Sequence, residues 1–192
     1  METKRPPWPG RVGQPVSVYF PIQKGRVYDL DLALALLKIY LQKVLKASYF
    51  FRPIMMVSVP AEATVAEREV VTELLYSAGA REVFTISQPL AAAIGSGVPI
   101  ADASGSFIVQ LGSGIVEGAV ISLASLVKAE SSTLAGSAVD LRVQATLKDV
   151  VGLNVSLETA ERLKKTVGSV DTQLQKEVLA TGQDIAKLSP KE

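Results

Sequence analysis

Hydrophobic and polar positions divide the middle of the chain into segments of distinct period. Residues 54–59 are a continuous β-type run that Pro60 closes, and residues 82–86 are a second strand-like segment. Such runs are typical of strands, and we expect both to be buried on both faces. Between them, Thr64 and Glu67 have the three-residue spacing of a helix capping box, and Gly79 predicts the end of that helix. The pattern predicts a βαβ unit, hence two parallel strands with a right-handed crossover.

The next part of the chain carries turn residues at closer intervals. Pro89 and Gly95 bracket a short alanine-rich helix. Three β-type segments follow, at residues 105–111, 115–123 and 127–133, with connections of only a few residues. Connections this short join antiparallel neighbours, so we expect a three-stranded meander.

The N-terminal segments are predicted from shorter patterns. Residues 16–20 alternate and contain Val and Tyr, which predicts a strand, and residues 26–28 predict a shorter one. Asp29 or Asp31 is placed to cap the helix that follows, whose two faces are apolar and basic. We expect this segment to end at Pro53.

The C-terminal third predicts two helices and a weak hairpin. One helix covers about residues 137–150, and a second begins near Ser156 and ends near Gly168. Residues 174–180 and 184–187 read as a final hairpin. The expected core consists of the β-branched and aromatic residues of the central strands, namely Val57, Val59, Val83, Phe84, Ile86, Ile108, Val109, Val120 and Ile121.

The composition excludes several classes of function. The chain has 192 residues, 48% of them hydrophobic and 20% charged, with a net charge of +1. A charge this small gives no electrostatic reason to expect nucleic acid as a partner. The absence of Cys and His excludes disulfides and a Ser-His-Asp triad, and makes a zinc hydrolase improbable.

The sequence predicts a cytoplasmic protein with at most peripheral membrane contact. The longest apolar stretch, residues 30–45, is interrupted by charged and amide side chains and is shorter than the roughly 20 residues that span a bilayer. No apolar segment follows Lys4 and Arg5, so we expect no signal peptide. Residues 6–9, PPWP, could touch a membrane surface or a partner, although a disordered or packed tail is the more ordinary interpretation.

Several ordered motifs resemble the MreB family of bacterial actins. Residues 80–95, AREVFTISQPLAAAIG, are similar to the family's AREVxxIEEPMAAAIG, and residues 110–117, QLGSGIVE, are similar to its glycine loop DIGGGTTE. Residues 52–60 resemble RPxxxVxVP, residues 21–30 resemble RPxKxGVIADF, and residues 159–168 resemble TAERIKxxIG. Each motif alone is weak, but their order and spacing agree over about nine-tenths of the chain.

The resemblance implies a fold and a function. The family belongs to the actin and heat-shock-chaperone ATPase superfamily, in which ATP lies between two ribonuclease-H-like domains. This chain would hold part of that α/β fold. Residues 1–53 would give an N-terminal segment with a strand and a helix, 54–104 the end of the first domain and the linking helix, 105–152 the start of the second domain, and 153–192 a partial helical and hairpin subdomain. The implied role is cytoskeletal, in cell shape and morphogenesis.

The resemblance also assigns site residues, and the metal position is changed. Gly112, Ser113 and Gly114 fall on the second phosphate hairpin, where backbone N–H groups bind phosphate oxygens. Gln110 stands where the family has the Asp that helps to hold Mg²⁺, which prefers charged oxygen ligands. Gln88 occupies the position that orients the attacking water. ATP and Mg²⁺ are thus implied cofactors, at a site we expect to be vestigial.

The adenosine side of the implied site has two interpretations. Gly136 matches a family segment near the nucleotide, and Glu161, Lys164 and Lys165 match positions that contact ribose and adenine in the chaperone branch. On a helix, Glu161 with Lys164 or Lys165 also forms an ordinary surface ion pair. The sequence leaves both readings open.

Two family segments have no counterpart among these residues, the DxGT turn of the first phosphate hairpin and the late GGG segment. We therefore expect no ATP turnover by this chain alone, even with Gln110→Asp. We also expect it to need a partner, either a second copy or a full-length MreB-type filament protein, unless its two half-sheets pair with each other. The alternatives are a nucleotide switch completed by a second chain, a nucleotide-independent module that caps or modulates filaments, and a gene fragment without function.

Overall fold

The computed structural model describes residues 19–45, 52–171, 173, 176–184 and 190–191. These residues fall into two compact units, residues 19–133 and the residues from Leu134 onward, and each unit is considered by itself. The domain boundaries expected from the sequence stay a prediction. None of the helices in the described ranges is both long and apolar enough to cross a bilayer.

The first unit begins with a hairpin of β1 (Ile22–Gln23) and β2 (Arg26–Val27). The prediction of a strand at residues 16–20 is wrong for Tyr19 and Phe20, which lie in no strand. Residues 16–18 are outside the described ranges. The reason is the two-residue turn, because Lys24 and Gly25 adopt positive φ angles of 50° and 74° and the strands must flank them.

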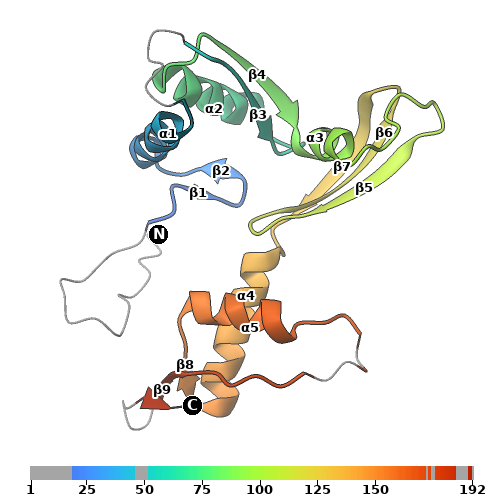
Figure 1. Cartoon of the computed structure of the whole chain (residues 1–192). Helices are drawn as coiled ribbons and strands as arrows, with labels where there is room; N and C mark the ends of the chain where they lie inside the picture. The colour runs from blue at the N-terminus through green and yellow to red at the C-terminus, as the bar shows by residue number, and fades with distance from the viewer. Residues whose placement is uncertain (1–18, 46–51, 172, 174–175, 185–189, 192) are drawn as a thin grey trace. The chain divides into compact units, whose positions relative to one another are not determined.

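Helix α1 (Leu30–Leu45) follows, and the Leu32 N–H donates to Asp29 Oδ1 at 3.0 Å, so Asp29 is the capping residue. The βαβ unit is confirmed: β3 (Ile54–Val59), α2 (Val65–Ser77) and β4 (Glu82–Ser87) occur in that order, and β3 and β4 are parallel (Figure 1). Thr64 and Glu67 make both hydrogen bonds of the capping box. These local signals fix the start of each helix.

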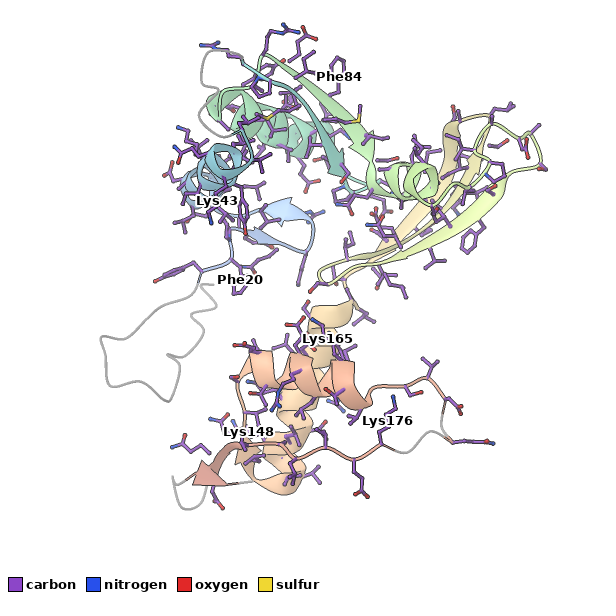
Figure 2. The ribbon with its side chains drawn as sticks, in the orientation of Figure 1. Phe20, Lys43, Phe84, Lys148, Lys165 and Lys176 are labelled. Atoms are coloured by element: carbon purple, nitrogen blue, oxygen red, sulfur yellow. The ribbon has the colours of Figure 1, made fainter. Side chains whose placement is uncertain are left out.

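The two strands of this unit are covered on one face only. Side chains along β3 alternate, with Ile54 53% and Met56 70% exposed and Val59 buried. Phe84 on β4, opposite Met56, is 50% exposed (Figure 2). The expectation of strands buried on both faces is therefore wrong, because in the described structure α2 packs on one side and leaves an apolar face of Ile54, Met56 and Phe84 uncovered.

A short helix, α3 (Gln88–Gly95), leads into the meander of β5 (Ser106–Leu111), β6 (Val116–Ser122) and β7 (Ser125–Ser132). The strands are antiparallel in the order β5-β6-β7, as predicted. Central strand β6 carries the deepest residues, including Ile121 at 0% exposure.

The predicted core is correct in part. Val59 and Ile121 are buried, and Val57, Val83, Ile86 and Ile108 are half-buried. Phe84, Val109 and Val120 are exposed, so the prediction is wrong for these three. Residues of a strand alternate between faces, and a face without a covering layer stays exposed whatever its composition.

The second unit contains α4 (Gly136–Thr146), which continues into a π-helical segment (Leu147–Val151), and α5 (Leu157–Val167). A small sheet has the order β10-β9-β8, with β8 at Leu153–Asn154, β9 at Gly182–Asp184 and β10 at Pro190–Lys191. Its core is Leu153, Val155 and Ala160.

The predicted C-terminal hairpin is misplaced. Residues 176–180 lie in no strand, and residues 174–175 and 185–187 are outside the described ranges. Asp184 belongs to β9, which pairs with β8 as well as with β10. Strand β9 has only three residues, too few to show an alternation of apolar and polar positions in the sequence. Its position is therefore determined by its pairing with β8 and β10.

Candidate functional site

The glycine hairpin between β5 and β6 is shaped by two close backbone approaches. The Gly112 N–H donates to the Ile115 carbonyl at 3.0 Å, and a Cβ on Gly112 would lie 2.5 Å from that oxygen. A Cβ on Gly114 would lie 3.0 Å from the backbone nitrogen of Lys24. A side chain at position 112 would clash with a backbone oxygen and one at position 114 would crowd the backbone of Lys24, so sterics favour glycine at both positions independently of any ligand.

The neighbour at Gly114 is the β1–β2 turn, which the sequence did not assign to the site. A Cβ on Gly25 would lie 2.7 Å from Pro60 Cγ and 3.8 Å from Ile115, so the turn packs between the end of β3 and the glycine hairpin. An ion pair of 2.6 Å from Arg26 Nε to Glu67 Oε1 holds the same turn to α2. The sequence showed the turn itself but not its partner, because Lys24 and Gly114 are 90 positions apart in the chain.

A buried polar pair lies at the base of the hairpin. Gln110 on β5 is directly opposite Glu117 on β6. Glu117 is 1% exposed, and its Oε1 accepts the Ala61 N–H at 2.7 Å. Within the described ranges, Glu117 Oε2 and Gln110 Oε1 are both buried without a hydrogen-bond partner. Burial raises the pKa of Glu117, the Ala61 N–H opposes this, and the nearby Glu62 adds to it.

The loop that binds Glu117 is held by Arg68 of α2. Arg68 donates from Nε to the Ala63 carbonyl at 3.2 Å and from Nη2 to the Ala61 carbonyl at 3.3 Å. Residues 60–63 thus link helix α2 to the meander through one arginine and one buried glutamate. Neither residue stood out in the sequence, because each matches an ordinary helix or strand position.

The described residues do not fit the Mg²⁺ that the resemblance implies. Gln110 brings no charge, and one carboxylate oxygen of Glu117 is taken by Ala61. The two oxygens without partners are closed off from solvent, whereas bound Mg²⁺ keeps several waters. In the described part of the chain no three His, Cys, Asp or Glu residues lie close enough to hold a metal ion.

Gln88, at the implied water-orienting position, is the first residue of α3 and is half-buried. The structure as described shows no hydrogen bond between Gln88 and the glycine hairpin. Its predicted role stays a prediction.

The remaining candidates lie in the second unit, where Lys164 has a structural role. Its Nζ lies 2.8 Å from Asp140 Oδ1, 2.9 Å from Asp140 Oδ2 and 3.0 Å from the Gly136 carbonyl. Asp140 is 7% exposed. The ammonium therefore joins α5 to the first turns of α4 and has little capacity left for a ligand.

Lys165 pairs with Glu161 four residues earlier, at 2.8 Å, on an exposed surface. This is the ordinary ion pair that the sequence offered as one reading. The hydrogen bond to Glu161 raises the pKa of Lys165. The adenosine contact remains a prediction for these residues.

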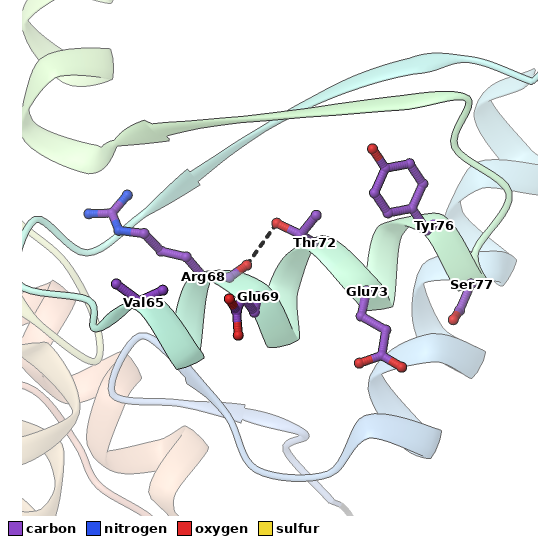
Figure 3. Close-up of a pocket in the computed structure, with 7 residues that line it drawn as sticks. All are labelled: Val65, Arg68, Glu69, Thr72, Glu73, Tyr76 and Ser77. Atoms are coloured by element: carbon purple, nitrogen blue, oxygen red, sulfur yellow. Dashed lines mark hydrogen bonds between the residues drawn. The ribbon is translucent and has the colours of Figure 1, made fainter.

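One open groove of about 640 Å³ lies along α2, lined by Val65, Arg68, Glu69, Thr72, Glu73, Tyr76 and Ser77 (Figure 3). Figure 3 shows the Arg68 guanidinium at one end and the Tyr76 ring at the other. Arg68 is already bonded to carbonyls of the 60–63 loop, so the one cation that lines the groove is engaged, and the other charged side chains along it are the carboxylates of Glu69 and Glu73.

Comparison with known proteins gives a consistent result. The profile of the MreB/Mbl protein family matches residues 8–192. The cell shape-determining protein MreB of Pasteurella multocida is 33% identical over 187 residues, which are 95% of this chain and 53% of that protein. The chain thus spans about half the length of the curated relatives it matches.

Solved structures agree with the fold. MreB5 of Spiroplasma citri bound to AMPPNP superimposes with a TM-score of 0.83 at 25% identity, covering 95% of this chain and 55% of that one. The MamK double helical filament superimposes with a TM-score of 0.71 at 22% identity, covering 90% and 54%. Both carry the actin-like fold, so the α/β class predicted from the sequence, a partial actin-like fold, is confirmed.

Proposed function

The chain belongs to the MreB/Mbl family, and from this membership we propose that it acts in cell-shape determination as a cytoplasmic, actin-like protein that assembles with MreB-type chains. The observation that carries the proposal is the family match over residues 8–192 together with the retained βαβ unit and meander. Assembly, and not nucleotide chemistry, is the function that the described residues support best.

Uncovered apolar surface supports assembly with another chain. Within the described ranges, β3 is bonded to β4 only and β5 to β6 only, so each sheet has open edges. Ile54, Met56 and Phe84 form an exposed apolar face beside one such edge. Unpaired edges and apolar faces favour pairing with another polypeptide. A MamK structure with the same fold is a double helical filament.

The glycine hairpin supports no hydrolysis by this chain alone. Gln110 supplies no carboxylate for a metal, and the polar pair at the base of the loop is closed to water. Ile115 and Val116 supply no hydroxyl groups beside the glycines. MreB5 of Spiroplasma citri was crystallised with AMPPNP and with ADP, and we expect this chain to bind nucleotide more weakly than such relatives do.

Co-sedimentation with polymerised full-length MreB tests the proposal. We expect the purified chain to enter the filament pellet equally with ATP and with ADP, and to release no phosphate from ATP above the buffer level. Phe84→Glu should reduce the pelleted fraction several-fold. Phe107→Glu on β5 is the matched control, because it adds the same charge at another exposed phenylalanine, away from the face of Ile54, Met56 and Phe84. Equal loss in both variants, or no pelleting of the unmodified chain, contradicts the proposed surface.

A second candidate is a nucleotide switch that another chain completes. The intact glycine hairpin favours it, since Gly112 and Gly114 both retain a tight loop geometry. Pelleting that requires ATP and is lost with ADP would support the switch over the nucleotide-independent module.

A further inference from the structure

The edge strands of the two larger sheets differ in charge. In the described structure β5 and β7 are the edges of the meander, and β3 and β4 each have one open side. Charged side chains lie on β7, at Lys128 and Glu130, and at the start of β4, at Glu82. Strands β3 and β5 contain no charged residue. Charges on an edge strand discourage pairing with another strand, so β3 and β5 are the two unprotected edges.

We propose that the open edges of β3 and β5 pair with each other between two copies of this chain, and that the two copies form a closed dimer. Each dimer contains two mixed sheets of strand order β4-β3-β5-β6-β7, with β3 and β4 from one copy and the meander from the other. The inference rests on the proposed function of assembly, and it deepens that function by naming a partner, a second copy, and the strands that bind it.

The backbone of β5 shows which groups are available at its edge. The Gly112 N–H donates to the Ile115 carbonyl at 3.0 Å, and Gln110 is directly opposite Glu117. Backbone groups in an antiparallel pair point alternately toward the partner strand and away from it. The even-numbered residues of β5 therefore bond to β6, and the odd-numbered residues direct their N–H and C=O groups to the open edge. These odd-numbered residues are Phe107, Val109 and Leu111.

The side chains of the two edge strands are compatible. Both strands have six residues. Both alternate, with Ile54 and Met56 exposed on β3, and Phe107 and Val109 exposed on β5. On the opposite faces, α2 packs against the sheet of β3 and β4, and α3 packs against β5. Strands joined with their exposed faces on the same side therefore keep both helix-covered faces together.

A second copy fits these edges because each copy brings one of each kind. Within one copy, β3 and β5 belong to separate sheets and are not bonded to each other. Two copies offer two β3 edges and two β5 edges, so reciprocal pairing satisfies all four. Such an interface closes on itself, whereas one-sided pairing continues into fibres.

The dimer leaves charged strands at its margins. Strands β4 and β7 become the outer strands of each joined sheet, where their charges discourage further pairing. The apolar face of Ile54, Met56 and Phe84 is not used by edge pairing, so it remains available to an MreB-type filament.

Analytical ultracentrifugation of the 192-residue chain over a concentration series, with amide hydrogen exchange, tests the inference. We expect a reversible equilibrium between monomer and dimer. The amides of Phe107, Val109 and Leu111 should exchange slowly in the dimer and rapidly after dilution. The amides of Ile108 and Gln110 are directed to β6 and should stay protected in both states, which makes them an internal control.

Substitutions at Val109 test the edge of β5. Val109→Pro removes a donor that β6 does not use, and proline is tolerated on edge strands. One backbone hydrogen bond is worth about fivefold in affinity, and the dimer contains two such edges, so the dissociation constant should rise about 25-fold. Val109→Lys keeps the backbone intact and should also weaken the dimer. Its matched control is Val127→Lys on β7, at another exposed valine, which should leave the dimer unchanged.

Cross-linking identifies the strands that meet. The chain has no cysteine, so Met56→Cys and Val109→Cys each provide one thiol per copy. A flexible bis-maleimide should join the two variants when they are mixed, and should join neither variant to itself with comparable yield.

Four results overturn the inference: a monomer at every concentration, polymers longer than a dimer, cross-linking of a single variant as efficient as that of the mixture, or equal weakening by Val109→Lys and Val127→Lys. A monomer whose β5 edge amides are protected indicates pairing within one copy. Protection that requires full-length MreB filaments indicates a filament chain as the partner.

Filament pelleting at dilutions where the chain is monomeric keeps the two proposals separate. Pelleting by a chain that forms no dimer would refute the dimer alone. Dimers of a chain that does not pellet would refute the assembly with filaments alone.

Discussion

Replacing Lys164 by methionine tests whether its ammonium group stabilises the packing of α5 against α4. The change keeps an unbranched side chain, shorter by one atom, and removes three polar contacts, two to Asp140 and one to the Gly136 carbonyl. Asp140 has a side chain that is only 10% exposed, so its carboxylate would be left in a poorly hydrated place. Breaking a buried ion pair on one side costs about 3–5 kcal/mol.

The expected magnitude is smaller because the pair is not completely buried. The Lys164 side chain is 24% exposed, and water relieves part of the penalty. We expect the free energy of unfolding to fall by roughly 2–4 kcal/mol. For a chain of 192 residues, the midpoint of thermal unfolding should fall by about 4–16 °C.

Urea denaturation followed by circular dichroism, with amide exchange in α4 and α5, measures this loss. Lys165→Met is the matched control, because it breaks an exposed pair with Glu161 and should cost much less than Lys164→Met. Combining Lys164→Met with Asp140→Leu should recover most of the loss, since apolar pairs often replace buried ion pairs at little cost. If Lys164→Met lowers the free energy of unfolding no more than Lys165→Met does, the proposed stabilising role of Lys164 is refuted.

Three other changes have defined outcomes. Thr64→Ala removes the capping box of α2 and should cost about 1 kcal/mol in denaturation experiments, whereas Thr133→Ala, outside any helix, should cost less. The pKa of Glu117 is raised in the fold, so its contribution to stability is present below the unfolded value of 4.5 and is lost as pH rises through the higher folded value. Glu117→Gln should therefore be less sensitive to pH over that interval, and an unchanged stability profile from pH 4 to pH 8 would argue against the burial effect. Gln110→Asp should leave ATP turnover at the buffer level, as measured by phosphate release.

Local signals account for the parts of the fold that the sequence predicted correctly. The capping box at Thr64 and Glu67, the proline that starts α3 and the short connections of the meander act within a few residues, and each was visible in the pattern. Burial was predicted less well because it depends on what covers a face. Phe84 and Val109 have strand-core composition, yet no described element covers them.

The site was predictable only where a motif carried it. Gly112 and Gly114 were found from the glycine loop, and the structure adds the close backbone contacts that favour glycine there. Lys24 and Arg68 were missed, because their contacts depend on packing between segments distant in sequence. Lys164 was assigned to a ligand by resemblance, but its three contacts are to Asp140 and Gly136.

Glu67 connects two features that were described separately, the start of α2 and the β1–β2 turn. One carboxylate accepts the Thr64 N–H and also pairs with Arg26, 41 positions earlier in the chain. The hydrogen bond from Thr64 lowers the pKa of Glu67, with a smaller contribution from Arg26. The helix cap is insensitive to ionic strength, whereas the exposed pair is screened by salt. Added salt should therefore weaken the ionic tie between the β1–β2 turn and α2, while the packing of the turn against Pro60 and Ile115 keeps it in place.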